Sequence, residues 1–265
     1  MITRIATLGL AFFMAFGLMI VGQSDAGLVG AWLFDEGSGD VAGDASGNGN
    51  DGALMNGAGW TAGVRGSAVS FVGGGDPQFI LFNADEDPAK AFILHSDSDA
   101  SMVLWVRPTE GGHGSWMWSR GDDADAGRFN VHNGPGDIFN FDYREDADKS
   151  PDPPHGGAAG IPTPIGEWTH VAITRVGNEY TFWGNGDVVE TWVDENPVLP
   201  TANGWIVGSP RGCCPLKADI DELGFFNIAL SGDQISAVMG GVEALGAVES
   251  SGKLATTWAD IKDRD

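Results

Sequence analysis

Short apolar runs, separated by clusters of glycine, proline, asparagine and aspartate, recur along this chain of 265 residues. Several runs alternate in the manner of strands: in Thr169–Arg175, the side chains of Val171 and Ile173 fall on one face. Glycine alone accounts for 41 residues, which suits frequent turns. Because no helical pattern alternates with the runs, the sheets that they form should be antiparallel. The sequence therefore predicts an all-β fold, a two-sheet antiparallel sandwich.

The predicted strands cover most of the chain. They are Leu28–Phe34, Ala68–Val72, Gln78–Asn83, Met102–Arg107, Ser115–Ser119, Arg128–His132, Ile138–Tyr143, Trp168–Arg175, Tyr180–Trp183, Val188–Val193, Trp205–Val207 and Asp219–Asn227. Asn185 and Gly186 lie between two of these runs, and an Asn-Gly pair in that position predicts a tight hairpin.

One short helix is expected near the C-terminal end. Ser231 and Gln234 form a capping box, and Ile235 is the first of the apolar residues that follow at helical spacing. After this helix the pattern weakens, and residues 243–265 are predicted to be a linker and a short tail. The tail is either frayed or docked as an amphipathic turn.

The first 26 residues have the features of a signal peptide. A positive start at Met1–Arg4 precedes the apolar run Ile5–Val21, and the small residues Ser24 and Ala26 favour cleavage before Gly27. The alternative is a retained anchor helix, although a run of about 17 residues is at the short limit for spanning a bilayer. The chain is therefore predicted to be secreted, periplasmic or on the cell surface, with no membrane span after cleavage.

The net charge of the chain is −23, from 37 acidic and 14 basic residues. Such a surface repels phosphate backbones, so nucleic acid is a poor candidate partner.

The loop Asp44–Gly52 combines aspartates, asparagines and a serine with three glycines and has no large apolar side chain. Glycines permit positive φ, and short oxygen-bearing side chains can turn inward on one centre. Oxygen-rich loops of this kind are what a calcium ion requires. The alternative is an Asx-rich turn without a metal, because Asn and Asp favour turns in any case.

A second unusual segment is Glu145–Pro164, which carries several aspartates and five prolines. It is predicted to be a long loop between two strands, either functional or a plain surface insertion. The only cysteines, Cys213 and Cys214, are adjacent. In an exported chain they could form a strained vicinal disulfide, remain two thiols in a turn, or bridge to another chain.

At this level of detail the chain resembles the LamG-like jellyroll domain of the concanavalin A-like lectin/glucanase superfamily. The motifs that carry the resemblance are Gly27–Gly39, Asp44–Gly52, Gly66–Phe71, Ser101–Pro108, Glu167–Thr174, Tyr180–Gly186 and Ile220–Ser231. They occur in order over residues 27–242. The resemblance implies a two-sheet jelly roll that binds an extracellular carbohydrate or protein and sometimes holds a calcium ion.

The resemblance also implies which residues would hold that ion. The acidic loop and the final strand can lie together at one edge of such domains, so Asp44, Asn48, Asn50 and Asp221 are the candidate ligands, with Glu36 as a further one. Backbone carbonyls would complete the six to eight oxygens of a structural calcium site.

Catalysis is not expected. Glycosidases of the same superfamily need two carboxylates across a sugar cleft. Asp219 and Asp221 would share a strand face about 7 Å apart, but the leading Glu of the glucanase signature is missing and Asp-Glu belongs to the ordinary last strand of the family. His170 lies in an apolar strand and is predicted to be a satisfied core histidine rather than a base.

The favoured function is therefore a binding module for carbohydrate or an extracellular partner. Trp116 and Trp118, two residues apart on a predicted strand, are candidate stacking residues, because aromatic rings pack on the apolar faces of sugars. A protein-interaction or structural module without sugar binding is the alternative, and a glycoside hydrolase a lesser one.

Overall fold

The computed structural model describes residues 27–82, 99–111, 114–120, 128–134, 138–144, 160–193, 204–208 and 215–245. For the strands between residues 114 and 144, and for residues 204–205, it describes the backbone only. The predicted signal peptide (1–26), the pair Cys213–Cys214, residues 145–159 of the predicted loop and the tail beyond residue 245 lie outside the described residues.

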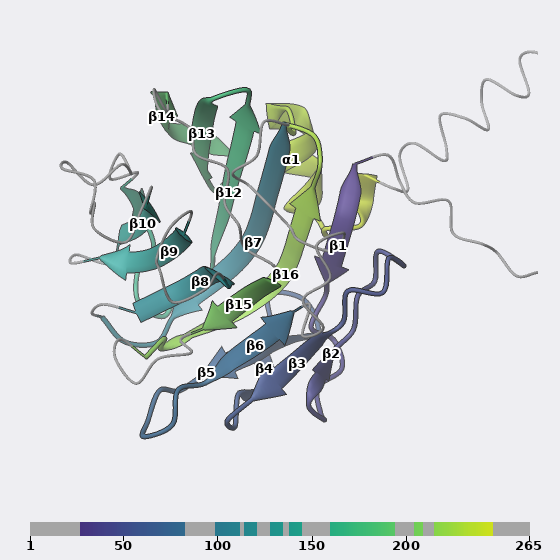
Figure 1. Ribbon diagram of the computed structural model, residues 1–265, viewed down its shortest axis with the longest axis vertical. Coiled ribbons are helices and arrows are strands. Elements are labelled where there is room, and N and C mark those ends of the chain that lie inside the picture. Colours follow the sequence, from purple (N-terminus) through teal and green to yellow (C-terminus); the bar gives the residue numbers. More distant parts are fainter. Residues whose placement is uncertain are drawn as a thin grey trace, which may run out of the picture.

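The described strands form two antiparallel sheets of eight strands each (Figure 1). Sheet A runs β14-β13-β12-β7-β16-β5-β4, and β1 also pairs with β16. Its strands are β14 (Asp187–Val193), β13 (Glu179–Gly184), β12 (Thr169–Val176), β7 (Ala100–Pro108), β16 (Ala218–Phe226), β5 (Ser67–Phe71), β4 (Gly59–Ala62) and β1 (Leu28–Trp32).

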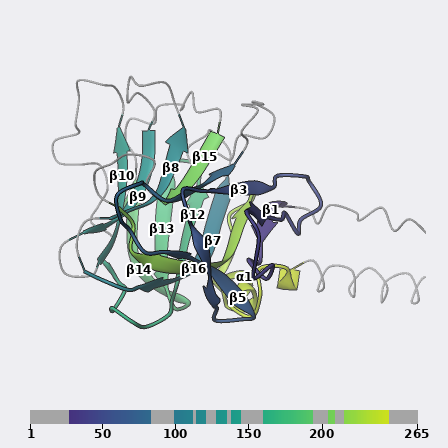
Figure 2. The same cartoon turned by 90° about the horizontal axis from the view of Figure 1, so that it is seen from below.

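Sheet B runs β11-β10-β9-β8-β15-β6-β3-β2. Its strands are β11 (Ile161–Pro162), β10 (Ile138–Arg144), β9 (Arg128–Gly134), β8 (Gly114–Arg120), β15 (Gly204–Gly208), β6 (Phe79–Phe82), β3 (Gly52–Met55) and β2 (Val41–Ala42). Figure 2 shows the two sheets as layers that face each other.

Every predicted strand is present, and the all-β sandwich is confirmed. The prediction missed β2, β3, β4 and β11, which have only two to four residues each and no visible alternation. It was wrong on the end of the segment 145–164, because Ile161–Pro162 is a strand paired with β10. Ile161 is fully buried, so burial rather than a sequence pattern fixes this strand.

The main core lies between the sheets. Sheet A contributes Met102, Leu104 and Val106 from β7 and Val171 and Ile173 from β12, in the alternation that the sequence showed. Sheet B contributes residues such as Ile80 and Phe82 of β6, and Trp32 of β1 packs among them. Burying both inner faces is what holds two half-apolar sheets together.

A second, smaller core lies on the outer face of sheet A under the helix α1 (Gly232–Val238). Ile235 and Val238 pack there on residues of β1, β7, β12 and β16. Figure 1 shows α1 next to β7 and β16. The predicted capping box is confirmed: Ser231 accepts from the Gln234 backbone N–H, and the Gln234 side chain accepts from that of Ser231. In the described part of the chain, no helix has the length and apolar character needed to span a membrane.

The predicted hairpin between β13 and β14 is also confirmed. Asn185 and Gly186 both have positive φ, 50° and 88°. Two positive values in a two-residue loop match the right-handed twist of the strands, and Asn and Gly tolerate them best.

Among the described residues, Trp32 has the largest fully buried side chain, and it provides a test of the core. Its ring centroid lies 4.5 Å from that of Phe82, and its Nε1–H donates to the Asn50 carbonyl at 2.9 Å. Trp32→Phe leaves a void and a buried carbonyl without its donor, so we expect the unfolding free energy in urea to fall by about 2–4 kcal/mol.

Trp60→Phe is the matched control. Trp60 also donates to a backbone carbonyl, that of Gly39 at 2.9 Å, but this bond is exposed and water can replace it. The unfolding free energy should therefore fall clearly less in Trp60→Phe than in Trp32→Phe. Equal decreases in the two variants would contradict this account of the core.

Candidate functional site

The loop that follows Asp44 covers the free edge of β1. β1 pairs with β16 on one side only. On the other side, the Ala31 N–H donates to Asp44 Oδ1 at 3.0 Å, and the Ala45 N–H donates to the Ala31 carbonyl at 2.7 Å. The loop thus takes the place of a neighbouring strand, which protects an otherwise unpaired edge.

The Asp44 carboxylate also holds the loop together. Oδ1 accepts from the Ser46 N–H at 3.0 Å, and Oδ2 accepts from the Asn50 N–H at 2.9 Å. Together with Ala31, three backbone N–H groups therefore point at one carboxylate. The Asp44 N–H is itself accepted by Asp51 Oδ1 at 2.8 Å.

Two asparagines of the loop bind β1 from the same side. Asn48 Nδ2 donates to the carbonyls of Leu28 and Val29, at 3.2 and 2.9 Å. Asn50 Nδ2 donates to the same Val29 carbonyl at 3.0 Å. Among the described residues, the buried Oδ1 of Asn50 has no hydrogen-bond partner.

The structure brings Asp44, Asn48 and Asn50 together on β1 but places Asp221 with a different loop. Glu36 Oε1 accepts from the Gly43 N–H at 2.7 Å. The four predicted ligands are therefore not gathered around one centre: the Asp44 oxygens accept backbone N–H groups, the two amide nitrogens donate to carbonyls of β1, and Asp221 binds another loop. Within the described residues, no three His, Cys, Asp or Glu side chains form a metal-binding group. Calcium stays a prediction.

Asp44→Asn tests which role the loop has. Asparagine has one acceptor oxygen and brings an NH₂ group against a backbone donor, so we expect a loss of about 1–3 kcal/mol in unfolding free energy. If the Asp44 carboxylate stabilises the fold only by accepting backbone N–H groups, Asp44→Asn lowers the unfolding free energy by the same amount in calcium and in EDTA. Thermal melting checks this, and an EDTA-dependent melting temperature of the unmodified protein would instead support the ion.

A second group of carboxylates lies where β16 changes partners. One edge of β16 pairs with β5 over Ala218–Ile220 and with β1 from Leu223 onward. The register with β7 on the other edge shifts between Asp221 and Gly224. Glu222 has φ of 51°, a conformation that non-glycine residues seldom adopt. The strand therefore bulges at this point and leaves backbone groups that the ladder does not pair.

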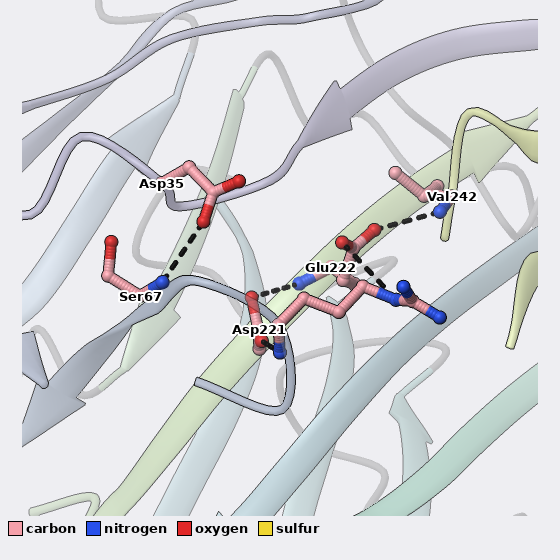
Figure 3. A network of polar contacts seen from close by, with 6 residues as sticks. Asp35, Ser67, Asp221, Glu222 and Val242 are labelled. Atoms are coloured by element: carbon pink, nitrogen blue, oxygen red, sulfur yellow. Dashed lines mark hydrogen bonds and ion pairs between the residues drawn. The ribbon is translucent and has the colours of Figure 1, made fainter. Parts of the chain in front are cut away.

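Acidic side chains satisfy the N–H groups around this bulge (Figure 3). Asp221 Oδ2 accepts from the Arg65 N–H at 3.1 Å, and its Oδ1 accepts from the Glu222 N–H at 2.9 Å. Glu222 Oε2 accepts from the Val242 N–H, just after α1, at 2.8 Å. Asp35, after β1, accepts from the Ser67 N–H at 3.0 Å.

Burial perturbs both acids of the bulge. It raises the pKa of Asp221 to about 7, while the hydrogen bond from the Arg65 N–H acts the other way and the charge of Glu222 adds to the rise. Burial also raises the pKa of Glu222, against the hydrogen bond from Val242 and the charge of Arg65, whose Nε lies 3.9 Å from its carboxylate.

The pKa of Asp221 makes stability depend on pH. Its ordinary value is 3.8, so between about pH 4 and 7 the folded protein holds a proton that the unfolded chain releases. This contribution is complete below the unfolded pKa and is lost as the pH rises through the folded one. We therefore expect the unfolding free energy of the unmodified protein, minus that of Asp221→Asn, to fall from pH 5 to pH 8 in urea titrations.

Using the difference between the two proteins removes an opposing contribution. Burial lowers the pKa of His170 to about 4, so His170 destabilises the fold as the pH falls from 6.5. Both proteins contain His170, and its contribution cancels. A difference that stays constant with pH would contradict the burial of an ionisable Asp221.

The two carboxylates considered for catalysis share one face of β16, as predicted, but each is bound to the protein. The Asp219 carboxylate accepts from Arg107 Nε at 2.9 Å, and Arg107 Nη2 lies 2.8 Å away. The Arg107 guanidinium stacks over the Trp168 ring at 4.7 Å. Asp221 accepts the backbone N–H groups described above. Both side chains thus fix the scaffold.

His170 is a buried core residue, as predicted, but it is not a satisfied one. Its Nδ1 has no hydrogen-bond partner among the described residues, and the same holds for Nε1 of its register partner Trp105. The two rings meet edge to face with centroids 5.2 Å apart.

The outer face of sheet B is identified by its register. Ile80 and Val207 are paired and belong to the core between the sheets. Leu81 and Ile206, one position along each strand, are also paired and lie outside that core cluster. Because successive strand residues alternate between faces, Leu81 and Ile206 mark the outer face.

The same register extends across β8, β9 and β10. Trp118 pairs with Ile206 on one side and with Asn130 on the other, and Asn130 pairs with Asp142. The next pair on this face is His132 and Asn140. On the outer face of sheet B, adjacent register positions are therefore held by Trp118, Asn130, Asp142, His132 and Asn140. Sequence reasoning missed the four polar positions, because they come together only through strand pairing.

The candidate stacking residues differ in their placement. Trp118 holds a regular register position on this outer face. The register between β8 and β9 shifts between Ser115 and Met117, so Trp116 lies at an irregularity rather than on the same regular ladder. The side chains of both tryptophans lie outside the described part of the structure.

Two facing antiparallel sheets with a short helix on one outer face define a concanavalin A-like sandwich. The sequence model of the concanavalin A-like lectin/glucanases superfamily matches residues 82–236, more than half of the chain, and the protein belongs to this superfamily. No curated protein matches the sequence.

Solved structures share the fold. Domain 4 of AbnA, a GH43 extracellular arabinanase from Geobacillus stearothermophilus solved with arabinotriose, has a TM-score of 0.60 and 20% identity over 80% of this chain and 98% of that one. The binding domain of botulinum neurotoxin serotype D has a TM-score of 0.58 and 13% identity over 81% of this chain. Botulinum neurotoxin type C, which interacts with two ganglioside molecules, has a TM-score of 0.61 and 11% identity over 82% of this chain. This chain spans 51% of each of the two toxin chains. At these identities the likeness concerns the fold alone.

Proposed function

We propose that this protein is an exported, non-catalytic module that binds carbohydrate on the outer face of sheet B. The observation that carries the proposal is the set of adjacent register positions held by Trp118, Asn130, Asp142, His132 and Asn140. Sugars present apolar C–H faces edged by hydroxyl groups, and they are bound by aromatic rings together with amide and carboxylate groups.

The opposite side of the sandwich is less suited to a ligand. Among the described elements, α1 packs on the outer face of sheet A. The polar side chains of that face, such as Asp219, Asp221 and Arg107, are engaged with other protein groups. Their engagement also supports a module without hydrolytic activity, because neither carboxylate is available to protonate or attack a glycosidic bond.

Comparison with solved domains supports the same function. The arabinanase domain was solved with arabinotriose bound, and it is matched over 98% of its length. Since the low identity transfers the fold only, arabinan-derived oligosaccharides serve here as the first probes rather than as an assigned ligand.

Binding of a glycan panel to the mature chain tests the proposal. We expect Trp118→Ala to weaken binding of the sugar that scores best by about tenfold or more, because a stacking contact of one ring is worth about 1–2 kcal/mol. Titration calorimetry with that sugar measures the change.

Trp168→Ala is the matched control, since it removes a tryptophan on the sheet A side that stacks on Arg107. It should lower stability and leave sugar affinity unchanged. Binding that is lost in the control and kept in Trp118→Ala would place the ligand elsewhere, and no binding to any glycan would contradict the proposal.

A protein partner is the second candidate. Val188, Val189 and Val193 of β14, an edge strand of sheet A, are 53%, 41% and 49% exposed. Exposed apolar side chains along one sheet edge favour a protein contact. Capture of an extracellular protein that is lost in Val188→Asp, together with a negative glycan panel, would favour this alternative.

A further inference from the structure

An arginine row crosses the outer face of sheet B at the pair Arg128–Arg144, and Arg120 lies on the same face. Arg128 and Arg144 are direct register partners on β9 and β10. Arg120 lies two residues beyond Trp118 at the end of β8, where it pairs with Gly204 of β15. All three positions lie on the same face as Trp118, because residues two apart on a strand share a face.

This row is unusual for a chain with only 14 basic residues and a net charge of −23. Directly opposed residues of an antiparallel pair have Cβ atoms about 5 Å apart, and like charges in that arrangement destabilise the sheet. Negative charge close by offsets this repulsion; Asp142, on the same face two residues before Arg144, is one source and a bound anionic group is another.

We propose that the arginine row selects an acidic saccharide, one that carries carboxylate or sulfate groups, for the binding face formed with Trp118. This inference rests on the proposed function and specifies its ligand class. The planar guanidinium forms two parallel hydrogen bonds with a carboxylate or sulfate, which a neutral hydroxyl group cannot match. The row lies one strand step of two residues, about 7 Å, from the row of Trp118 and Asn130, within the span of a short oligosaccharide.

The charge of the rest of the molecule gives this row its importance. A net charge of −23 repels anionic ligands at long range, but salt screens that repulsion beyond about 8–10 Å. Direct contact with the paired Arg128 and Arg144 acts inside that distance. An acidic saccharide would thus be bound at this row and repelled from most of the remaining surface.

The competing source of negative charge is the chain itself. In the sequence, Asp122, Asp123 and Asp125 lie between Arg120 and Arg128, and Glu145 follows Arg144 directly. These four acids lie outside the described residues, whereas Asp142, on the same face two residues before Arg144, belongs to β10. The experiment therefore has to separate arginines that pair with the chain from arginines that bind a ligand.

Titration calorimetry of the mature chain with trigalacturonate, a sulfated trisaccharide and arabinotriose provides this separation. We expect at least one acidic sugar to bind more tightly than arabinotriose, with affinity that falls as salt increases. Arg128→Gln and Arg144→Gln should each weaken the acidic sugar by about tenfold or more, since hydrogen bonds between charged groups are worth about 1.5–3 kcal/mol. Arg144→Lys should recover only part of the loss, because lysine lacks the fork.

Lys217→Gln is the control for charge alone. It removes one positive charge from the sheet A side, where Lys217 pairs with the exposed Glu110, and should leave the affinity unchanged. The carboxylate and sulfate arms identify which anionic group is bound.

Three results would overturn the inference. Equal binding of acidic and neutral sugars, unaffected by the arginine variants, would leave the proposed function intact and remove the selection for acidic groups. Lower melting temperatures of the arginine variants with unchanged sugar affinity would show that the row pairs with the chain's own acids. No binding of any of the three sugars, nor of the wider glycan panel, would contradict the proposed function itself.

Discussion

The capture of backbone N–H groups by buried acidic side chains at the bulge of β16 is the interaction on which the continuity of sheet A depends. β16 is buried along its whole length and lies between β7 on one edge and β5 and β1 on the other. Where it passes from β5 to β1, the ladder cannot continue, and Asp221 and Glu222 bind the turn before β5 and the segment after α1 instead. A buried N–H without an acceptor would cost about 1–3 kcal/mol, so these contacts allow one strand to serve two partners.

The loop of Asp44 likewise binds backbone groups that no strand pairs, at the other edge of β1. There, backbone groups that β16 cannot reach are bound by one aspartate and two asparagines. The motifs through which the chain resembles its family, the acidic loop and the Asp-Glu of the last strand, thus each satisfy the unpaired backbone of a strand junction. Their acidity therefore serves the fold first. It does not by itself indicate a metal or a catalytic pair, because a carboxylate that accepts several N–H groups has little capacity left for either.

Local patterns predicted much of this fold. The alternation of β12, the Asn185-Gly186 turn and the capping box of Ser231 are all set by neighbours in sequence, and the structure confirms each of them. The network around Asp221 could not be predicted in this way, because its partner Arg65 is 156 residues away and the bulge exists only once both β5 and β1 have paired. For the same reason, the family resemblance predicted Asp221 beside the Asp44 loop, whereas its observed partners are the backbone N–H groups of Arg65 and Glu222.

The outer faces of sheet A and sheet B differ in how their polar residues are arranged. On sheet A, α1 packs on the outer face, and the carboxylates there bind other protein groups. Arg107, for example, is paired with Asp219, with Nη2 and Oδ2 2.8 Å apart. On sheet B, Arg128 and Arg144 are directly opposed, and Trp118, Asn130 and Asp142 hold the neighbouring row of register positions. The proposed function assigns recognition to sheet B because, on sheet A, charged groups such as Asp219 and Arg107 bind each other, whereas on sheet B two arginines hold directly opposed positions.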